Sequence, residues 1–208
     1  MKVLLVNGSP HAEGCTFTAL TEVAGALEKQ GIETEMFQLG TKAISGCLGC
    51  GACYNTGRCF MNDSVNEFLD KALEADGFVF GSPVHYASAS GMLSSFMDRV
   101  FFAGSATGKF AYKPAAAVVS ARRAGTTSAF DQINKYFTIS NMPIVSSQYW
   151  NMVHGFTPED VKMDLEGMQT MRTLGNNMAW LLKSIETGKT QGLPLPEREE
   201  AVYTNFIR

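Results

Sequence analysis

The sequence has no long apolar run, no basic stripe and no secretory signal. No stretch of the 208 residues approaches the length of a membrane span. The apolar run after Met1 is too short for a signal peptide, and no small-residue cleavage site follows it. The 17 basic side chains are outnumbered by 20 acidic ones and form no cluster, which argues against a nucleic-acid partner. We therefore expect a cytoplasmic protein without membrane contact, in a compartment where thiols stay reduced.

Two common nucleotide-binding signatures are also absent. The chain contains no G-x-G-x-x-G for a dinucleotide and no G-x-x-x-x-G-K-[ST] for a nucleoside triphosphate. It has no internal repeat and no linker that marks a domain boundary, and its length suits one α/β domain. We expect this domain over residues 1–188, followed by a polar, proline-containing arm over 189–208 that lies on the surface or on a partner subunit.

Apolar runs alternate with helical periodicities along the chain. Strands are expected at 2–6, 33–39, 77–81, 114–120 and 143–150. Helices are expected at 16–30, after Asn62 or Asp63, at 90–102, at 127–138 and as one long helix within 160–186. This alternation predicts parallel βαβ units covered on both faces. Right-handed crossovers around a central first strand predict a five-stranded parallel sheet of order 2-1-3-4-5 in a three-layer α/β/α sandwich.

The loop after the first strand has the features of a phosphate site. It reads Asn7-Gly8-Ser9-Pro10-His11-Ala12-Glu13-Gly14-Cys15-Thr16, with hydroxyls at Ser9 and Thr16. Gly14 permits close backbone approach where the helix starts. Unpaired N–H groups and the positive end of the helix dipole favour a dianionic phosphate there. An ordinary capped helix after a tight turn is the alternative.

Two further loops would emerge at the same edge of the sheet. The third strand leads into Gly81-Ser82-Pro83-Val84-His85-Tyr86, a turn of small residues with an aromatic that suits a flat heterocycle. The fourth ends at Ser120 and continues through Arg122 and Arg123 to Gly125. Ligands of open α/β sheets bind at this edge, so three such loops predict one ligand site. His85 is interpreted either as a ligand contact or as a satisfied loop histidine, and one of the two arginines as a solvated charge.

The paired motifs G-S-P-x-x-x-G-x-T and G-S-P-V-x-Y-x-x-x-x-G resemble those of the NADPH-dependent FMN reductase group of flavodoxin-like proteins. The resemblance covers about the first 150 residues and implies an FMN-dependent oxidoreductase. It implies an FMN phosphate held around Ser9, His11, Gly14, Cys15 and Thr16. It also implies an isoalloxazine ring that lies against Pro83, Val84, His85 and Tyr86, with Ser120 and Gly125 on its far side.

Four of the five cysteines lie in one segment, residues 43–60, expected to be a loop. Cys47, Cys50, Cys53 and Cys59 have the spacing C-x2-C-x2-C-x5-C. Thiolates so spaced can bind a [4Fe–4S] cluster, and the interleaved glycines leave N–H groups free to bond sulfur. The pattern resembles the compact cysteine motif of iron-sulfur flavoproteins. A zinc site usually uses two separated knuckles, whereas free thiols that merely pack are the main alternative.

Three functions remain open on these residues. We expect an NAD(P)H-dependent flavin or quinone reductase, in which NAD(P)H reduces FMN and a small molecule or a protein accepts the electrons. The alternatives are an electron carrier with FMN and a [4Fe–4S] cluster, fed by ferredoxin, and a flavin-dependent binding module without turnover. No catalytic side chain is assigned. The aromatic segment 149–156 is interpreted as a partner surface or a buried loop, and we expect a homodimer or homotetramer.

Overall fold

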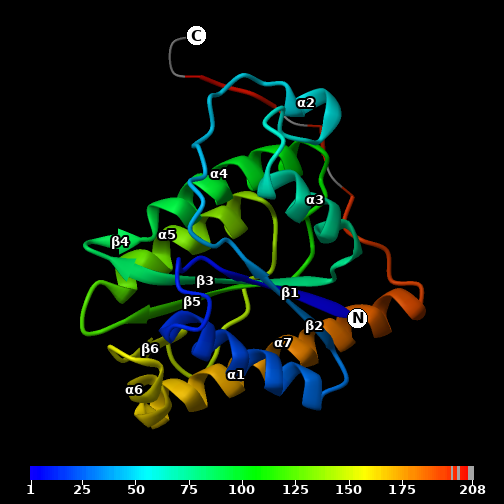
Figure 1. The fold of residues 1–208 in the computed structure, drawn as a ribbon. Coiled ribbons are helices and arrows are strands. Elements are labelled where there is room, and N and C mark those ends of the chain that lie inside the picture. The colour runs from blue at the N-terminus through cyan, green and yellow to red at the C-terminus, as the bar shows by residue number, and fades with distance from the viewer. Residues whose placement is uncertain (198, 201, 206–208) are drawn as a thin grey trace.

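The fold is a parallel sheet with helices on both faces (Figure 1). The structure is a computed structural model, and it describes residues 1–197, 199–200 and 202–205. The strands are β1 (Lys2–Asn7), β2 (Glu33–Gln38), β3 (Gly77–His85), β4 (Ser88–Ala89), β5 (Ala115–Ala121) and β6 (Met152–His154). The helices are α1 (Cys15–Lys29), α2 (Cys53–Thr56), α3 (Ser64–Glu74), α4 (Gly91–Ala106), α5 (Thr126–Ile139), α6 (Pro158–Met163) and α7 (Leu165–Thr190).

The strand order is β2-β1-β3-β5-β6, and all of these pairs are parallel. This is the predicted order 2-1-3-4-5, because the additional strand β4 only forms an antiparallel two-residue hairpin with the end of β3. The expected flavodoxin-like fold class is thus confirmed. Strand β1 is an interior strand between β2 and β3, in agreement with its apolar and almost wholly buried sequence.

Successive residues of the strands face opposite helical layers. Leu4 and Val6 of β1 belong to the core beneath α3, α4 and α5, where phenylalanines such as Phe80 dominate. Val3 and Leu5 face the core beneath α1 and α7. Figure 1 shows these two layers above and below the sheet, with α2 outside the upper one. The helices therefore cover both faces and leave the carboxyl edge of the sheet free for a ligand.

Several local expectations are corrected. The last strand is Met152–His154 rather than 143–150, where only Ile144 bridges to β5. Asp164 divides the expected long helix, because its side chain accepts from the Gly167 amide and starts α7. The cysteine segment contains the short helix α2, and β3 continues through His85.

The carboxyl-terminal part of the chain differs from expectation in its boundary. Helix α7 continues through Thr190, past residue 188, so the segment without helix starts later than predicted. Within the expected arm 189–208, residues 198, 201 and 206–208 lie outside the described residues. In the described part of the chain, no helix combines the length and apolarity needed to cross a bilayer.

Candidate functional site

A cavity of about 840 Å³ opens at the carboxyl edge of the sheet. Four segments line it: 9–16 after β1, 83–85 in β3, 120–122 at the end of β5 and 155–158 after β6. Its volume lies in the range of small-molecule and cofactor sites. It lies at β1 and β3, where the strand order reverses and ligands of such sheets bind.

The predicted phosphate loop, residues 7–16 after β1, is stabilised by polar contacts of its own. The Ser9 amide donates to Asn7 Oδ1 at 3.1 Å, and the His11 amide donates to Ser9 Oγ at 3.1 Å. Gly14 is the N-cap of α1, and no side chain caps this helix or places a negative charge in its first turn. Donors that a side chain would otherwise occupy are therefore left for an anion.

Two hydroxyls join the start of α1 to the end of β5. Thr16 Oγ1 and Ser120 Oγ lie 2.8 Å apart, and both residues are buried. Cys15 is next to them, with its Sγ 3.7 Å from the Gly155 carbonyl oxygen. Burial raises the pKa of the Cys15 thiol, so the neutral form is favoured in this part of the cavity wall.

The first and third strands approach so closely that Gly8 is required. Its amide donates to the Gly81 carbonyl at 2.9 Å, and a Cβ at Gly8 would lie 2.7 Å from that oxygen. Ser90, the N-cap of α4, donates its hydroxyl to the Gly8 carbonyl at 3.0 Å. The Ser90 amide donates to Ser82 Oγ at 2.9 Å. These two bonds of Ser90 fix the end of β3 against the loop after β1.

The β3 turn brings only part of its predicted residues to the cavity. Pro83, Val84 and His85 line it, whereas Tyr86 does not. Tyr86 has a φ of 59° at the tip of the β3–β4 hairpin, and its side chain is fully exposed. Gly125, with a φ of 89°, lies behind the wall, where a Cβ would be 2.9 Å from Val84 Cγ1. All other predicted flavin-contacting residues line the cavity.

One wall of the cavity was missed by sequence reasoning. It consists of Arg122, one of the two arginines that the sequence left open between a ligand contact and a solvated charge, and of the segment 155–158. Asp160 shapes this wall, since its carboxylate accepts from the Phe156 and Thr157 amides at 3.0 Å each. These amides, that of Thr157 most strongly, hold the pKa of Asp160 below its usual range. The sequence T-P-E-D that begins at Thr157 is a capping-box signal for α6 and could have revealed the wall.

The four clustered cysteines surround a second, much smaller hollow of about 20 Å³. Cys47, Cys50, Cys53 and Cys59 all line it, and each is a free thiol. In the part of the chain that the structure describes, no three His, Cys, Asp or Glu side chains are grouped to hold one metal ion. The thiols as placed thus make no mononuclear metal centre. In a [4Fe–4S] cluster each thiolate binds a different iron, so the four sulfurs need not converge on one point.

An open parallel sheet of this order, with a cavity at its carboxyl edge, defines a flavodoxin-like α/β protein. Residues 1–157 match the model of the family described as NADPH-dependent FMN reductase, and the chain belongs to this family. The protein is therefore an FMN-dependent oxidoreductase.

A curated relative and two solved structures are also similar to the chain, the structures in fold. The chain is 35% identical to an iron-sulfur flavoprotein of Methanocaldococcus jannaschii, over 89% of this chain and 100% of that protein. An NAD(P)H:quinone oxidoreductase from Methanothermobacter marburgensis has the same fold, with a TM-score of 0.64 at 17% identity, over 86% of this chain and 98% of that one. A flavodoxin, WrbA-like protein from Agrobacterium tumefaciens superposes with a TM-score of 0.60 at 14% identity, over 88% and 96% of the two chains.

Proposed function

We propose that the protein holds FMN in the large cavity and transfers electrons from NAD(P)H to a quinone or to a second flavin. The observation that carries this proposal is the start of α1, which has no capping side chain and faces a cavity of about 840 Å³. The residues present fit a flavin mononucleotide, because the start of α1 offers N–H donors and hydroxyls, and the end of β3 offers Pro83 and Val84 as apolar contacts for a flat ring.

In this proposal the phosphate group lies on the amides that begin α1, beside Ser9 and Thr16. Gly14 keeps the approach free of a side chain, and the helix dipole favours the negative charge. The flavin ring lies against Pro83, Val84 and His85, with Ser120 on the side of β5. Arg122 contributes a positive charge at the same cavity.

When bound, FMN supplies the hydride chemistry, and the protein supplies position and electrostatics. The backbone of Pro83–His85 orients the ring, and the wall at 155–158 covers one side of the cavity. No side chain has to act as an acid or a base in hydride transfer, so none is assigned that role. The open side of the cavity is where the nicotinamide nucleotide would approach.

The phosphate site is tested by comparing FMN with riboflavin. In Gly14→Asp the new carboxylate caps the free amides of α1 and repels a phosphate, while the helix itself gains a better N-cap. We expect FMN affinity to fall at least tenfold, with riboflavin affinity and the stability of the apoprotein preserved. Gly14→Asn is the matched control, since it caps the helix without charge and should weaken FMN less.

Flavin fluorescence quenching measures both affinities. Equal affinities of the wild type for FMN and riboflavin would refute the phosphate assignment. Steady oxidation of NADPH or NADH in the presence of a benzoquinone tests the reductase activity. A flavin-loaded protein that oxidises neither nucleotide would contradict this part of the proposal.

A second candidate function is electron transfer through FMN and a [4Fe–4S] cluster held by Cys47, Cys50, Cys53 and Cys59. The arrangement of these four thiols around one hollow supports it, together with the name of the M. jannaschii relative. The donor set fits an all-thiolate cluster, and the Gly49 amide already donates to Cys47 Sγ at 3.4 Å. Such a cluster supplies one-electron transfer and needs a reducing compartment, for which we propose the cytoplasm.

Anaerobic purification distinguishes the two candidates. Iron and sulfide at four per chain, and a protein reduced by ferredoxin but not by NADPH, would favour the carrier. NADPH oxidation by a protein without iron would favour the reductase. The replacement Cys50→Ser alters an exposed thiol, so loss of iron from this variant with retention of FMN would assign the cluster to the hollow.

We further propose that a second copy of the chain covers the open cavity. Tyr149, Trp150 and Phe156 are exposed, and Phe156 also lines the cavity. Exposed aromatic groups of this kind commonly mark interfaces. Light scattering should give a dimer or tetramer for the wild type and a smaller species for the Trp150→Ser, Phe156→Ser variant. A wild-type monomer at high concentration would contradict this.

A further inference from the structure

Among the residues that the structure describes, Arg99 has the largest fully buried side chain. It lies on α4, and its side chain is only 1% exposed. A guanidinium keeps its charge at all physiological pH values, so burial is tolerated only when every donor has a partner. The partners of Arg99 therefore indicate why the protein retains a charge there.

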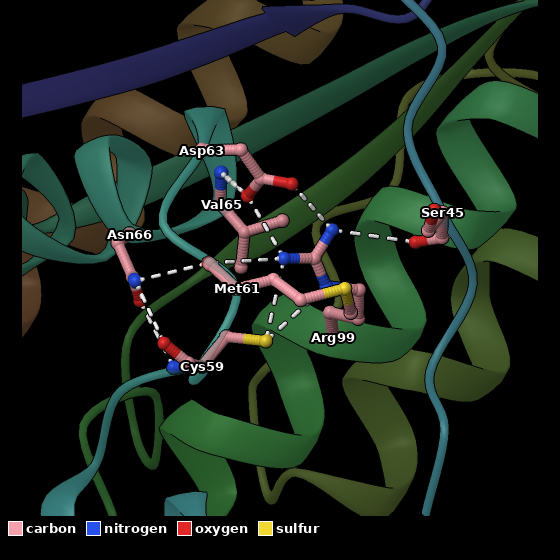
Figure 2. Close-up of polar contacts among 7 residues, drawn as sticks. All are labelled: Ser45, Cys59, Met61, Asp63, Val65, Asn66 and Arg99. Carbon is pink, nitrogen blue, oxygen red and sulfur yellow. Dashed lines mark hydrogen bonds and ion pairs between the residues drawn. The ribbon is translucent and has the colours of Figure 1, made fainter.

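The guanidinium lies between a carboxylate and a sulfur atom (Figure 2). Its Nη1 and Nη2 donate to the two carboxylate oxygens of Asp63 at 2.7 and 2.8 Å. Nε and Nη2 both lie 3.3 Å from Cys59 Sγ. The carbonyls of Ser45 and Met61 accept at 3.3 Å. Arg99 thus joins the loop before the cysteines, the last cysteine and the start of α3.

Cys59 is fixed through its backbone as well as its side chain. Asn66 accepts from the Cys59 amide at 2.9 Å and donates to the Cys59 carbonyl at 2.8 Å, as Figure 2 also shows. Asn66 is itself only 4% exposed, and its amide also donates to the Met61 carbonyl at 3.2 Å. Cys47 and Cys50, in contrast, are exposed on the glycine-rich part of the loop. Among the four thiols, Cys59 is the one with a side-chain partner that carries charge.

We propose that Arg99 is a positioning residue that orients Cys59 Sγ toward the cysteine hollow and tunes the reduction potential of the iron–sulfur cluster. This inference rests on the second candidate function above. Hydrogen bonds to cluster sulfurs are among the features that set these potentials, and partners behind a metal ligand are a general means of tuning it. Two N–H donors on one thiolate withdraw electron density and stabilise the reduced, more negative state.

Asp63 has the opposite effect on the same sulfur. Its carboxylate pairs directly with the guanidinium and partly neutralises it. It also caps α3, where Oδ1 accepts from the Val65 amide at 3.1 Å. Removal of the Asp63 charge leaves the cation uncompensated beside Cys59, whereas removal of the Arg99 charge leaves an anion. The two substitutions are therefore expected to shift the potential in opposite directions, which a merely structural role does not require.

The experiment is a redox titration of anaerobically purified protein with reconstituted cluster, followed by the EPR signal of its reduced form. We expect Arg99→Gln to lower the ratio of reduced to oxidised cluster at fixed potential at least tenfold, which is about 59 mV for a one-electron couple. Asp63→Asn keeps the cap on α3 and should raise that ratio. Arg99→Lys keeps the positive charge but loses the planar set of guanidinium donors. Its ratio of reduced to oxidised cluster should lie between those of Arg99→Gln and the wild type.

Arg58→Gln is the matched control. Arg58 precedes Cys59 in the chain, but its half-exposed guanidinium pairs with Asp70 and makes no hydrogen bond to sulfur. It should change the reduced-to-oxidised ratio less than twofold. Circular dichroism and bound FMN establish that each variant is folded, and iron content is measured in parallel.

The outcomes separate this inference from the proposals on which it depends. Loaded Arg99 and Asp63 variants with unchanged potentials, or with shifts of the same sign, would overturn it. If Arg99→Gln does not fold, Arg99→Lys and Asp63→Asn still test the sign. A wild type that binds FMN but no iron overturns the cluster and this inference together and leaves the flavin proposal intact.

Discussion

The hydroxyl pair of Thr16 and Ser120 offers a direct test of how the cavity is built. Because the two oxygens lie 2.8 Å apart and both residues are buried, removal of one hydroxyl leaves the other unpaired. Thr16→Val keeps the shape of the side chain, and Ser120→Ala leaves a small void. Each substitution should lower the free energy of unfolding by about 1–3 kcal/mol, the cost of an unsatisfied buried polar group.

The double variant Thr16→Val, Ser120→Ala should lose less than the sum of the single variants. Both partners of the bond are then gone, so no orphaned hydroxyl remains, and a coupling energy of about 1 kcal/mol is expected. The free energy of unfolding of each variant is measured by urea unfolding of the apoprotein, provided that its dependence on urea concentration is the same in all variants. As a control, Thr18→Val removes a hydroxyl that bonds only the Gly14 carbonyl, and it should combine additively with Ser120→Ala. Additive losses for Thr16 and Ser120, within about 0.3 kcal/mol, would refute the reasoning.

Three further predictions concern the strand contact, the cavity wall and the ligand. Gly8→Ala places a Cβ 2.7 Å from the Gly81 oxygen, so it should lower the urea midpoint and cost about 1–3 kcal/mol of unfolding free energy. Gly25→Ala has open space around its Cβ and should stabilise the protein by about 0.5–1 kcal/mol. Equal urea midpoints for the two variants would contradict this prediction. Asp160 has a lowered pKa in the folded state, so its stabilisation is complete above the ordinary pKa near 3.9 and is lost as the pH falls through the lower folded value. In Asp160→Asn the urea midpoint should therefore depend less on pH below about pH 4 than it does in the wild type. The same pH dependence in both proteins would contradict a stabilising role of the Asp160 carboxylate. FMN at a hundredfold its Kd should add about 2.7 kcal/mol to the free energy of unfolding, and a concentration-independent melting temperature would exclude binding to the folded state.

The order of strands and the convergence of three loops could be predicted because they follow from short-range signals. Apolar runs and helix caps are local properties, and the handedness of crossovers is a general one. Gly31, with its positive φ, follows the end of α1, and Asp63 caps the start of α3; both roles depend only on neighbouring residues. These signals predicted that the segments after β1, at the end of β3 and at the end of β5 meet at one edge of the sheet, where the structure has a common cavity.

The position of the last strand could not be predicted in this way. Residues 143–150 have a strand-like composition, but Tyr149 and Trp150 are exposed, and it is Met152 that pairs with Val119 of β5. That register depends on a partner strand far along the chain, which apolar patterning alone does not specify.

The burial of Arg99 was equally hidden in the sequence. Its position on a helix with Phe96, Met97 and Val100 suggests an ordinary polar residue at the margin of an apolar face. Only the folded chain brings Asp63 and Cys59 to it, from positions 36 and 40 residues away. Contacts of this separation carry no local signal, so the structure was needed to connect the cysteines to a charge.

Helix α4 has a consequence for how the two proposed sites are placed relative to each other. Ser90, at its start, is bonded to the phosphate loop, and Arg99, further along it, is bonded to the last cysteine. A single helix therefore connects the two attachment points, and the distance between them follows from a rise of about 1.5 Å per residue. An insertion or deletion of one residue between Ser90 and Arg99 would change both the distance and the angle between these two attachment points, because each residue of an α-helix adds a fixed rise and rotation.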